Sequence, residues 1–242
     1  MLDFIFPRVC PFCESASKDG RVCNSCLLQI RFIGKNSVCL RCGVPSDFTE
    51  TSDRSDPMKS VSSHFCGQCL LGRFYFDRAR SVAFYDGLLR DMLHKFKYQG
   101  RLNLGRAISN ILIENFPADL DIPDIIIPVP LYIGRLRKRE YNQSVILGEG
   151  LSRYLRVSFN PFVLKRIRDT RPQFEIKSED EKRKNVKGAF SLDESGKIKG
   201  KSVLIIDDIF TTGSTIDECA RVVLDSGASR VQALTLMRAV QA

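Results

Sequence analysis

This chain of 242 residues lacks several features that would assign it to a familiar class. It has no tryptophan, which excludes nothing, but it also has no apolar run near the ~20 residues that a membrane-spanning helix needs. Its first residues, MLDFIFPRV, carry no basic segment, and Pro7 and Arg8 interrupt their apolar stretch, so we predict no signal peptide. No GxxxxGKS or GxxxxGKT sequence occurs, and no GxGxxG sequence follows a predicted strand, which excludes a Walker A loop and a dinucleotide fingerprint. We therefore expect a cytoplasmic protein without membrane contact, whose thiols are reduced.

The composition is that of a soluble globular protein. Hydrophobic residues make up 43% and charged residues 27%, and the length suffices for one substantial domain and a small accessory one. The net charge of +9 is uneven, because residues 77–200 alone carry +8. Such a surplus suits a substrate with several phosphates and equally suits a nucleic-acid backbone, so charge does not choose between them.

Eight of the nine cysteines form four CxxC pairs. The pairs are Cys10/Cys13, Cys23/Cys26, Cys39/Cys42 and Cys66/Cys69. Each CxxC turn directs two thiolates at one ion, and two turns complete a tetrahedral zinc site. Disulfides suit a cytosolic chain poorly, a thioredoxin-like motif would be single, and four regular pairs fit zinc ribbons better than an iron–sulfur cluster. We predict structural zinc, because four cysteines leave no coordination position open.

The pairing of these turns stays open at the level of sequence. Sequential pairing joins the first two turns at one ion and the last two at another, whereas the cross-braced pairing of RING domains joins alternate turns. The polar stretch from Thr49 to Ser63 is expected to be a mobile loop. The ninth cysteine, Cys219, falls on an apolar helix face and is expected in the core.

Residues 201–215, KSVLIIDDIFTTGST, carry the most chemical information. Residues 203–206 are apolar, as expected of a parallel strand buried on both faces, and Asp207 and Asp208 follow where that strand is expected to end. The loop that leads into a segment of helical apolar spacing consists of Thr211, Thr212, Gly213, Ser214 and Thr215. Such a loop offers N–H and hydroxyl donors to a phosphate, and the aspartates can accept hydrogen bonds from sugar hydroxyls. The arrangement indicates a ribose 5-phosphate site, although two capping acids and an ordinary turn would give a similar pattern.

Further elements are expected upstream. Residues 74–85 favour a strand, residues 88–96 have the apolar spacing of a helix, and the basic turn after it, residues 97–101, could approach a phosphate. Residues 125–130, IIIPVP, predict a second buried strand, and Asn142 is a suitable cap for a helix that carries Leu147 and Leu151.

Two segments after the second predicted strand are rich in charged residues. Arg135, Arg137, Lys138 and Arg139 follow the second strand, either as a solvated face or as a polyanion site. Residues 165–190 contain nine basic and five acidic residues and few apolar ones, so they form a linker or a lid. We favour a lid, because the segment directly precedes the motif strand.

Together these segments resemble the ComF family of competence-associated proteins. The resemblance rests on the CxxC pairs followed by LHKFKYQGR, IIIPVPL, RLRKREYNQS, RDTRPQ, KRKNVKGAF and VLIIDDIFTTGST. It implies an α/β protein: a type I phosphoribosyltransferase fold in residues 77–242, with a parallel sheet flanked by helices and a hood at about 160–190, after a small double zinc-ribbon domain in residues 1–76. The PVP turn and the TRPQ to KNVKGAF region are also similar to amidophosphoribosyltransferases, where they form a pyrophosphate loop and a closing hood.

The resemblance also implies roles for single residues. Asp207 and Asp208 would hold the ribose hydroxyls of phosphoribosyl pyrophosphate (PRPP), and the loop from Thr211 to Thr215 its 5-phosphate. Val129, Pro130 and Leu131 would approach the pyrophosphate, Arg135 and Arg137 are candidates to stabilise it, and Mg²⁺ would clamp it. No general base and no acceptor pocket can be predicted.

Two functions are compatible with this resemblance. The first is an enzyme in which a nucleophile displaces pyrophosphate at C1 of the ribose, mainly by positioning and charge stabilisation. The second is a phosphoribosyltransferase scaffold that binds single-stranded DNA and partner proteins in DNA uptake or recombination. Aromatic side chains near basic residues could stack on bases or belong to the core; these are Phe96, Tyr98, Tyr132 and Tyr141. The intact motif favours PRPP binding as the first function.

Overall fold

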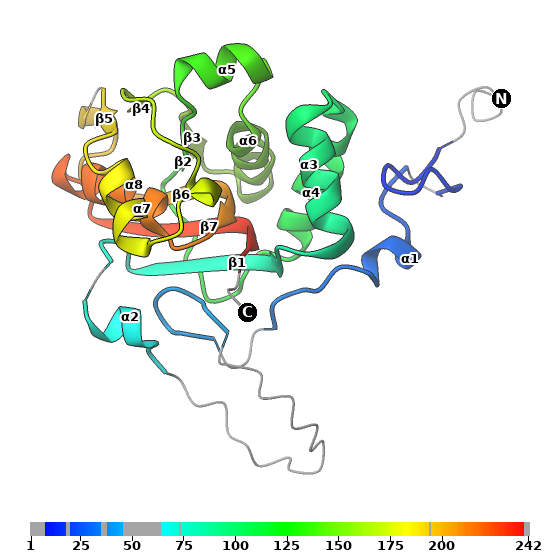
Figure 1. Cartoon of the computed structure of the whole chain (residues 1–242), viewed down its shortest axis with the longest axis horizontal. Coiled ribbons are helices and arrows are strands. Elements are labelled where there is room, and N and C mark those ends of the chain that lie inside the picture. The colour runs from blue at the N-terminus through cyan, green and yellow to red at the C-terminus, as the bar shows by residue number, and fades with distance from the viewer. Residues whose placement is uncertain are drawn as a thin grey trace, which may run out of the picture.

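The computed structural model describes residues 8–17, 20–34, 38–45, 64–72, 74–193 and 195–239. The stretch Thr49–Ser63, expected to be a loop, lies outside these residues. The elements in chain order (Figure 1) are α1 (Asn24–Leu27), α2 (Gly67–Leu70), β1 (Arg78–Phe84), α3 (Gly87–Tyr98), α4 (Leu102–Glu114), β2 (Ile125–Pro128), α5 (Ile133–Arg139), α6 (Gln143–Leu155), β3 (Ser158–Phe159), β4 (Leu164–Arg166), η2 (Gln173–Glu175), α7 (Glu179–Val186), β5 (Phe190–Leu192), η3 (Ser195–Lys197), β6 (Ser202–Phe210), α8 (Ser214–Asp225) and β7 (Arg230–Arg238).

A five-stranded sheet forms the centre of the molecule. Its strand order is β1-β7-β6-β2-β3, and all neighbouring strands are parallel. The strand predicted at residues 203–206 is the middle strand β6, but it runs on to Phe210, because Asp207 pairs with Thr235 and Phe210 with Arg238 of β7. The two aspartates therefore lie in the last part of the strand, where the neighbouring strand fixes their direction, and not after it.

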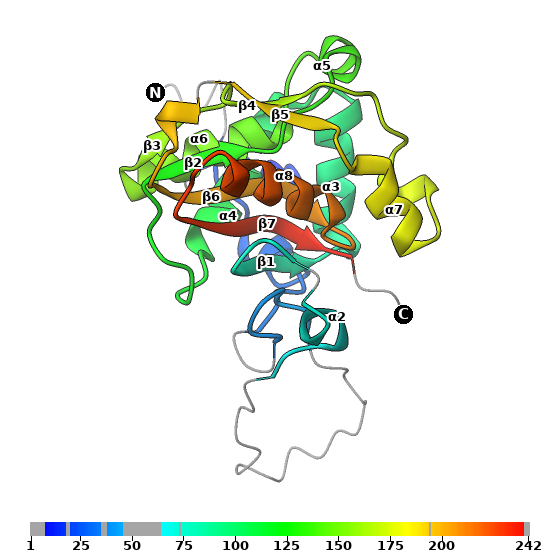
Figure 2. The same cartoon turned by 90° about the vertical axis from the view of Figure 1, so that its left-hand side faces the viewer.

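Side chains on the two faces of β6 enter two different cores. Leu204 and Ile206 join a hydrophobic cluster with α3, α4 and α6, whereas Val203 and Ile205 join a second cluster with α8. This alternation follows from the two-residue period of a strand and requires apolar residues at every position. The helices consequently cover both faces of the sheet (Figure 2), as predicted for a parallel α/β fold.

Helix α6 and the charged segment at residues 165–190 can both be compared with the sequence predictions. Asn142 caps α6 as expected, since its Oδ1 accepts a hydrogen bond from the Ser144 N–H at 3.0 Å. The charged segment at residues 165–190 contains α7 and, with its flanks, a two-stranded antiparallel sheet of β4 and β5. Val186 of α7 and Phe190 of β5 are buried in the hydrophobic cluster that includes α8, whereas Ile167 is exposed. The segment is therefore anchored to α8 at its carboxyl-terminal half, and its role as a lid stays a prediction.

The cysteine-rich segment spans the edge of the sheet. Cys10 and Cys26 belong to the cluster on the α4 face, and Cys39 and Cys42 to the cluster on the α8 face. Between these positions the chain runs beside β1 and exchanges backbone hydrogen bonds with it: the Ile33 N–H donates to the Val82 carbonyl at 2.9 Å, the Phe84 N–H to the Arg31 carbonyl at 2.9 Å and the Ala79 N–H to the Arg41 carbonyl at 2.7 Å. The open edge of β1 is thereby covered.

In the part of the chain that the structure describes, no helix combines the length and the apolar character needed to cross a membrane.

Candidate functional site

The cysteines form two clusters with the geometry of tetrahedral metal sites. One holds Cys10, Cys13, Cys23 and Cys26, the other Cys39, Cys42, Cys66 and Cys69, and within each cluster all Sγ atoms lie within 4.8 Å of one another. The Sγ–Sγ distance is 3.9 Å for Cys10–Cys26, 3.6 Å for Cys13–Cys23 and 3.6 Å for Cys42–Cys66. Four sulfurs at 2.3 Å from a zinc ion would be about 3.8 Å apart, so both sets fit zinc. The structure thus pairs the turns sequentially, and none of the nine cysteines forms a disulfide.

A cavity of about 460 Å³ opens at the carboxyl ends of the sheet strands. Asp207 and Asp208 of β6 line it, together with the turn after β2 and with Thr211 and Thr215 of the motif loop. Five cations also line it: Lys97, Arg135, Arg139, Arg166 and Arg171. Among the described residues, the two aspartates are its only acids. The cavity therefore offers an acidic pair within a basic wall, which suits a ligand that has both hydroxyls and anionic groups.

The two aspartates have different surroundings. Asp207 accepts a hydrogen bond from the Ser144 hydroxyl at 2.8 Å and from the Asp208 N–H at 2.9 Å. Asp208 forms an ion pair with Lys97 of α3, with 2.7 Å between Nζ and Oδ2. Burial, reinforced by the negative charge of Asp208, raises the pKa of Asp207 to about 7. The carboxyl of Asp207 therefore holds its proton more tightly than an ordinary aspartate.

The motif loop connects β6 to the amino end of α8. Gly213 adopts φ +79°, and a Cβ atom there would lie 2.5 Å from Cζ of Phe210, so only glycine fits. Thr212 and Ser214 share a hydroxyl hydrogen bond of 2.8 Å. The first N–H groups of α8 have no acceptor within the helix, and a phosphate beside the loop could accept from them.

The turn after β2 is fixed by the cap of α6. The Asn142 side-chain amide donates to the Val129 carbonyl at 2.9 Å, which ties the start of the turn Val129-Pro130-Leu131 to the helix. Two buried donors in this wall, Nε2 of Gln143 and Nε of Arg166, have no hydrogen-bond partner among the described residues. Burial and the nearby charge of Arg135 lower the pKa of Arg166. Unpartnered buried donors are costly, and an anion in the cavity would supply their acceptors.

The residues singled out from the sequence fall into three places. Val129, Pro130, Leu131, Arg135, Asp207, Asp208, Thr211 and Thr215 line the cavity. Thr212 and Gly213 in the loop and Ser214 at the start of α8 are not among the residues that line it, and neither is Arg137, which is exposed on α5. Their roles as ligand contacts stay predictions.

Other cavity residues could not be identified from the sequence pattern. Lys97, expected in a basic turn, lies in the last turn of α3 and reaches across the cavity to Asp208. Gln143, Ser144 and Arg166 carry no local signal, since a glutamine, a serine and one arginine within a charged run are common on any surface.

Comparison with known proteins divides the chain into two matched parts. The family model of the double zinc ribbon domain matches residues 1–70, and that of the phosphoribosyl transferase domain matches residues 142–241. The DNA utilization protein YhgH of Escherichia coli K12 is 31% identical over 240 residues, which cover 96% of this chain and 97% of that protein. The competence protein F of Haemophilus influenzae is 30% identical over 214 residues, covering 86% and 93%, and the competence protein ComFC of Bacillus subtilis is 27% identical over 231 residues, covering 91% and 85%.

These matches confirm the predicted fold class, a phosphoribosyltransferase fold with a small zinc-ribbon domain before it. The zinc-ribbon match and the two cysteine clusters together support structural zinc. The predicted boundary between residues 76 and 77 stays a prediction, although the first sheet strand starts at Arg78.

Proposed function

The chain belongs to the family of the competence protein F and the DNA utilization protein YhgH, and we propose on this premise that it binds PRPP at the carboxyl ends of β2 and β6. The observation that carries the proposal is the acidic pair Asp207–Asp208 placed between the motif loop and a wall of five cations. PRPP has a matching order of groups: its ribose hydroxyls lie between the 5-phosphate and the pyrophosphate.

Each part of the ligand has a corresponding part of the cavity. The ribose hydroxyls would hydrogen-bond to Asp207 and Asp208, displacing Lys97 from Asp208. The 5-phosphate would lie against the loop from Thr211 to Thr215, where N–H groups and hydroxyls converge. The pyrophosphate would face the turn at residues 129–131, with Arg135, Gln143 and Arg166 as donors.

The same residues could assist transfer of the phosphoribosyl group. As the bond from C1 to pyrophosphate breaks, the sugar gains positive charge and the leaving group gains negative charge. Asp207 and Asp208 would stabilise the first and the arginines the second, without a proton transfer from the protein. Mg²⁺ bound with the ligand would neutralise further charge on the pyrophosphate. Lys97, released from Asp208, would face the departing anion.

A second candidate function is binding of single-stranded DNA in DNA uptake. It is favoured by Tyr98, which is 53% exposed, with the Arg139 guanidinium 4.9 Å from its ring centre and a hydrogen bond of 3.0 Å between Arg139 Nη2 and the tyrosine hydroxyl. An exposed ring beside cations is a surface on which a base can stack. This surface adjoins the PRPP cavity, so one chain could bind both.

Calorimetric titration with PRPP and Mg²⁺ tests the first proposal. We expect binding by the wild type and at least a tenfold loss of affinity in the double variant Asp207→Asn/Asp208→Asn. The matched control is Asp193→Asn, which removes an exposed acid that pairs with Lys165 outside the cavity and should change nothing. No binding heat from the wild type, or full binding by the double variant, would contradict the proposal.

Fluorescence anisotropy with a labelled oligothymidine over a salt series tests the second. Binding should weaken steeply with salt, and Tyr98→Ala should lower affinity by the roughly 1–3 kcal/mol typical of one stacked base. Phe162→Ala is the control, since Phe162 is equally an exposed aromatic residue but does not line the cavity. Equal losses in both variants would argue against a stacking site at Tyr98.

A further inference from the structure

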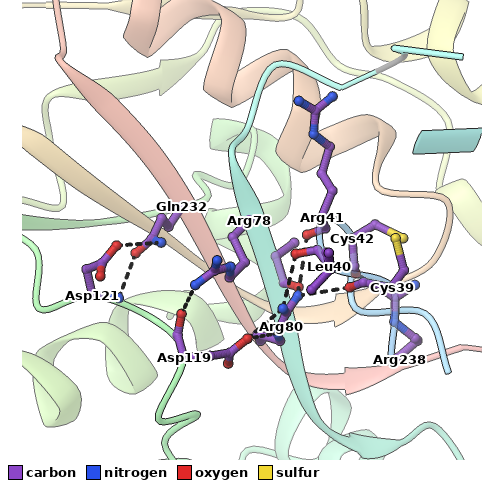
Figure 3. A network of polar contacts seen from close by, with 11 residues as sticks. Cys39, Leu40, Arg41, Cys42, Arg78, Arg80, Asp119, Asp121, Gln232 and Arg238 are labelled. Carbon is purple, nitrogen blue, oxygen red and sulfur yellow. Dashed lines mark hydrogen bonds and ion pairs between the residues drawn. The ribbon is translucent and has the colours of Figure 1, made fainter. Parts of the chain in front are cut away.

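Two buried arginines of the central sheet contact the Cys39–Cys42 turn of the second cysteine cluster (Figure 3). Arg80 of β1 donates to the carbonyls of Cys39 at 3.3 Å, Leu40 at 3.1 Å and Arg41 at 3.5 Å, and Arg238 of β7 donates to the carbonyl of Cys42. Every carbonyl of this CxxC turn therefore accepts a hydrogen bond from a strand arginine. The side chains that do this are almost fully buried, Arg80 at 6% and Arg238 at 4% exposure.

The charge of the cluster explains why arginines are found there. Four thiolates around a divalent zinc ion leave a net charge of about −2, and a buried charge needs compensation by opposite charges and hydrogen bonds. Arg80 is shared with Asp119, whose Oδ2 lies 2.6 Å from its Nη2, whereas Arg238 faces the cluster. The first cluster is packed differently, on apolar side chains that include Phe12 and Ile30.

The other face of Arg238 rests on Phe210. The guanidinium carbon lies 4.0 Å from the centre of the phenylalanine ring. Phe210 is the last residue of β6, is buried, and pairs with Arg238 in the strand register. Its ring in turn fills the space beneath Gly213, which is why a Cβ there would lie 2.5 Å from Cζ. The Cys42 carbonyl, Arg238, Phe210 and the motif loop thus form an unbroken series of contacts.

We propose that Arg238 is a positioning residue that couples metal binding at the second cysteine cluster to ligand binding at the motif loop. This inference rests on the proposed function of that loop. With the metal bound, the Cys39–Cys42 turn is fixed, its last carbonyl holds the guanidinium against Phe210, and the ring supports Gly213. Without the metal the turn is released, and both Arg238 and the loop above Phe210 lose their support.

Coupling of this kind is reciprocal, which gives it a direct signature. A ligand that orders the motif loop must strengthen metal binding at the second cluster by the same factor by which the metal strengthens ligand binding. The first cluster lies on the opposite face of the sheet and makes no contact in this series, so its metal should not respond. We expect an effect of roughly fivefold or more, within the usual range for coupled sites.

The experiment follows zinc release from the zinc-loaded full chain to a chromogenic chelator, with and without ribose 5-phosphate. In the wild type, ribose 5-phosphate should slow release from one cluster only, and Cys13→Ser, which dismantles the first cluster, should keep the slowed phase. Arg238→Met should abolish the slowing and weaken ribose 5-phosphate binding in calorimetry about tenfold. The matched control is Arg230→Met, since Arg230 lies on the same strand, is half-exposed and pairs with Asp121 away from both clusters; this variant should behave as wild type.

A second variant separates coupling from loss of folding. Phe210→Leu keeps Arg238 and both clusters but removes the aromatic face, so zinc release without ligand should stay as in the wild type while the ligand effect disappears. Three results would overturn the inference and leave the proposed function intact. Ribose 5-phosphate could slow zinc release from both clusters, or bind without slowing release from either. The slowing could also be unchanged in Arg238→Met. A wild type that binds neither ribose 5-phosphate nor PRPP would overturn the proposed function and the inference with it.

Discussion

Replacement of Asp207 by asparagine should stabilise the ligand-free protein while it weakens ligand binding. The carboxyl is partly buried beside a second acid, and both effects raise its pKa to about 7. Asparagine keeps an Oδ1 atom that can accept from the Ser144 hydroxyl and the Asp208 N–H, so the hydrogen bonds of the site survive. What the substitution removes is the repulsion between two neighbouring carboxylates.

The size and sign of the effect follow from proton linkage. An aspartate has a pKa of about 3.9 in the unfolded chain, so the folded state binds this proton more tightly by about three pKa units, or about 4 kcal/mol at most. A raised carboxyl pKa means that stability is lost as the pH rises from about 4 to about 7. The carboxylate keeps some contact with solvent, so we expect a gain of about 2 kcal/mol for Asp207→Asn at pH 8 and about half of that at pH 5.5.

Urea unfolding in the presence of zinc, at pH 5.5 and pH 8, measures this gain. The control is Asp124→Asn directly before β2, where hydrogen bonds from the hydroxyl and N–H of Ser202, the first residue of β6, lower the pKa of the carboxyl. That substitution should destabilise the protein at pH 8, with a cost that fades only as the pH falls below the usual range of an aspartate. An Asp207→Asn variant that is less stable than the wild type at pH 8, or equally stabilised at both pH values, would refute the reasoning.

Three further substitutions test the surroundings of the cavity. Gly213→Ala forces a side chain into the left-handed region and onto the Phe210 ring, so we expect a loss of at least about 1–2 kcal/mol in urea unfolding and weaker ribose 5-phosphate binding in calorimetry. Asn142→Ala removes the cap of α6 and the donor to the turn after β2 and should cost about 1–3 kcal/mol in the same unfolding assay. Lys97→Met breaks the ion pair with Asp208, both of whose side chains are only 13% exposed, and should cost about 1–3 kcal/mol without ligand. A neutral result for any of the three would show that the contact named does not hold the cavity.

The elements that the sequence predicts well are those with a local cause. Strand β6 and helix α6 were recognisable because apolar residues recur with the period of their own element, and Asn142 because a cap acts on the next two residues. The zinc clusters were predictable as a chemical type for the same reason, since each CxxC turn is complete within four residues. Their sequential pairing was not, because the third turn could reach the first or the fourth equally well.

The parts of the cavity that escaped prediction depend on contacts between distant residues. Lys97 and Asp208 form an ion pair across the cavity. No sequence pattern near either residue predicts that the two are in contact. Arg238 is similar: arginine is usually exposed, and here the Cys39–Cys42 turn and the Phe210 ring, both distant in the sequence, cover its side chain. Such residues are set by the order of strands in the sheet, which a pattern of apolar residues does not encode.

The position of β7 between β1 and β6 determines the order in which the protein can be completed during translation. Strand β1 ends at Phe84 and Arg238 lies roughly 150 residues later, so at 5–20 residues per second β1 waits about 8–30 s for its neighbour to be made. Cysteines 39 to 69 are synthesised long before then, whereas Arg238, which faces their cluster, is synthesised only with β7. The first cluster contacts residues made early, whereas the second reaches its final surroundings only after β7 has been synthesised.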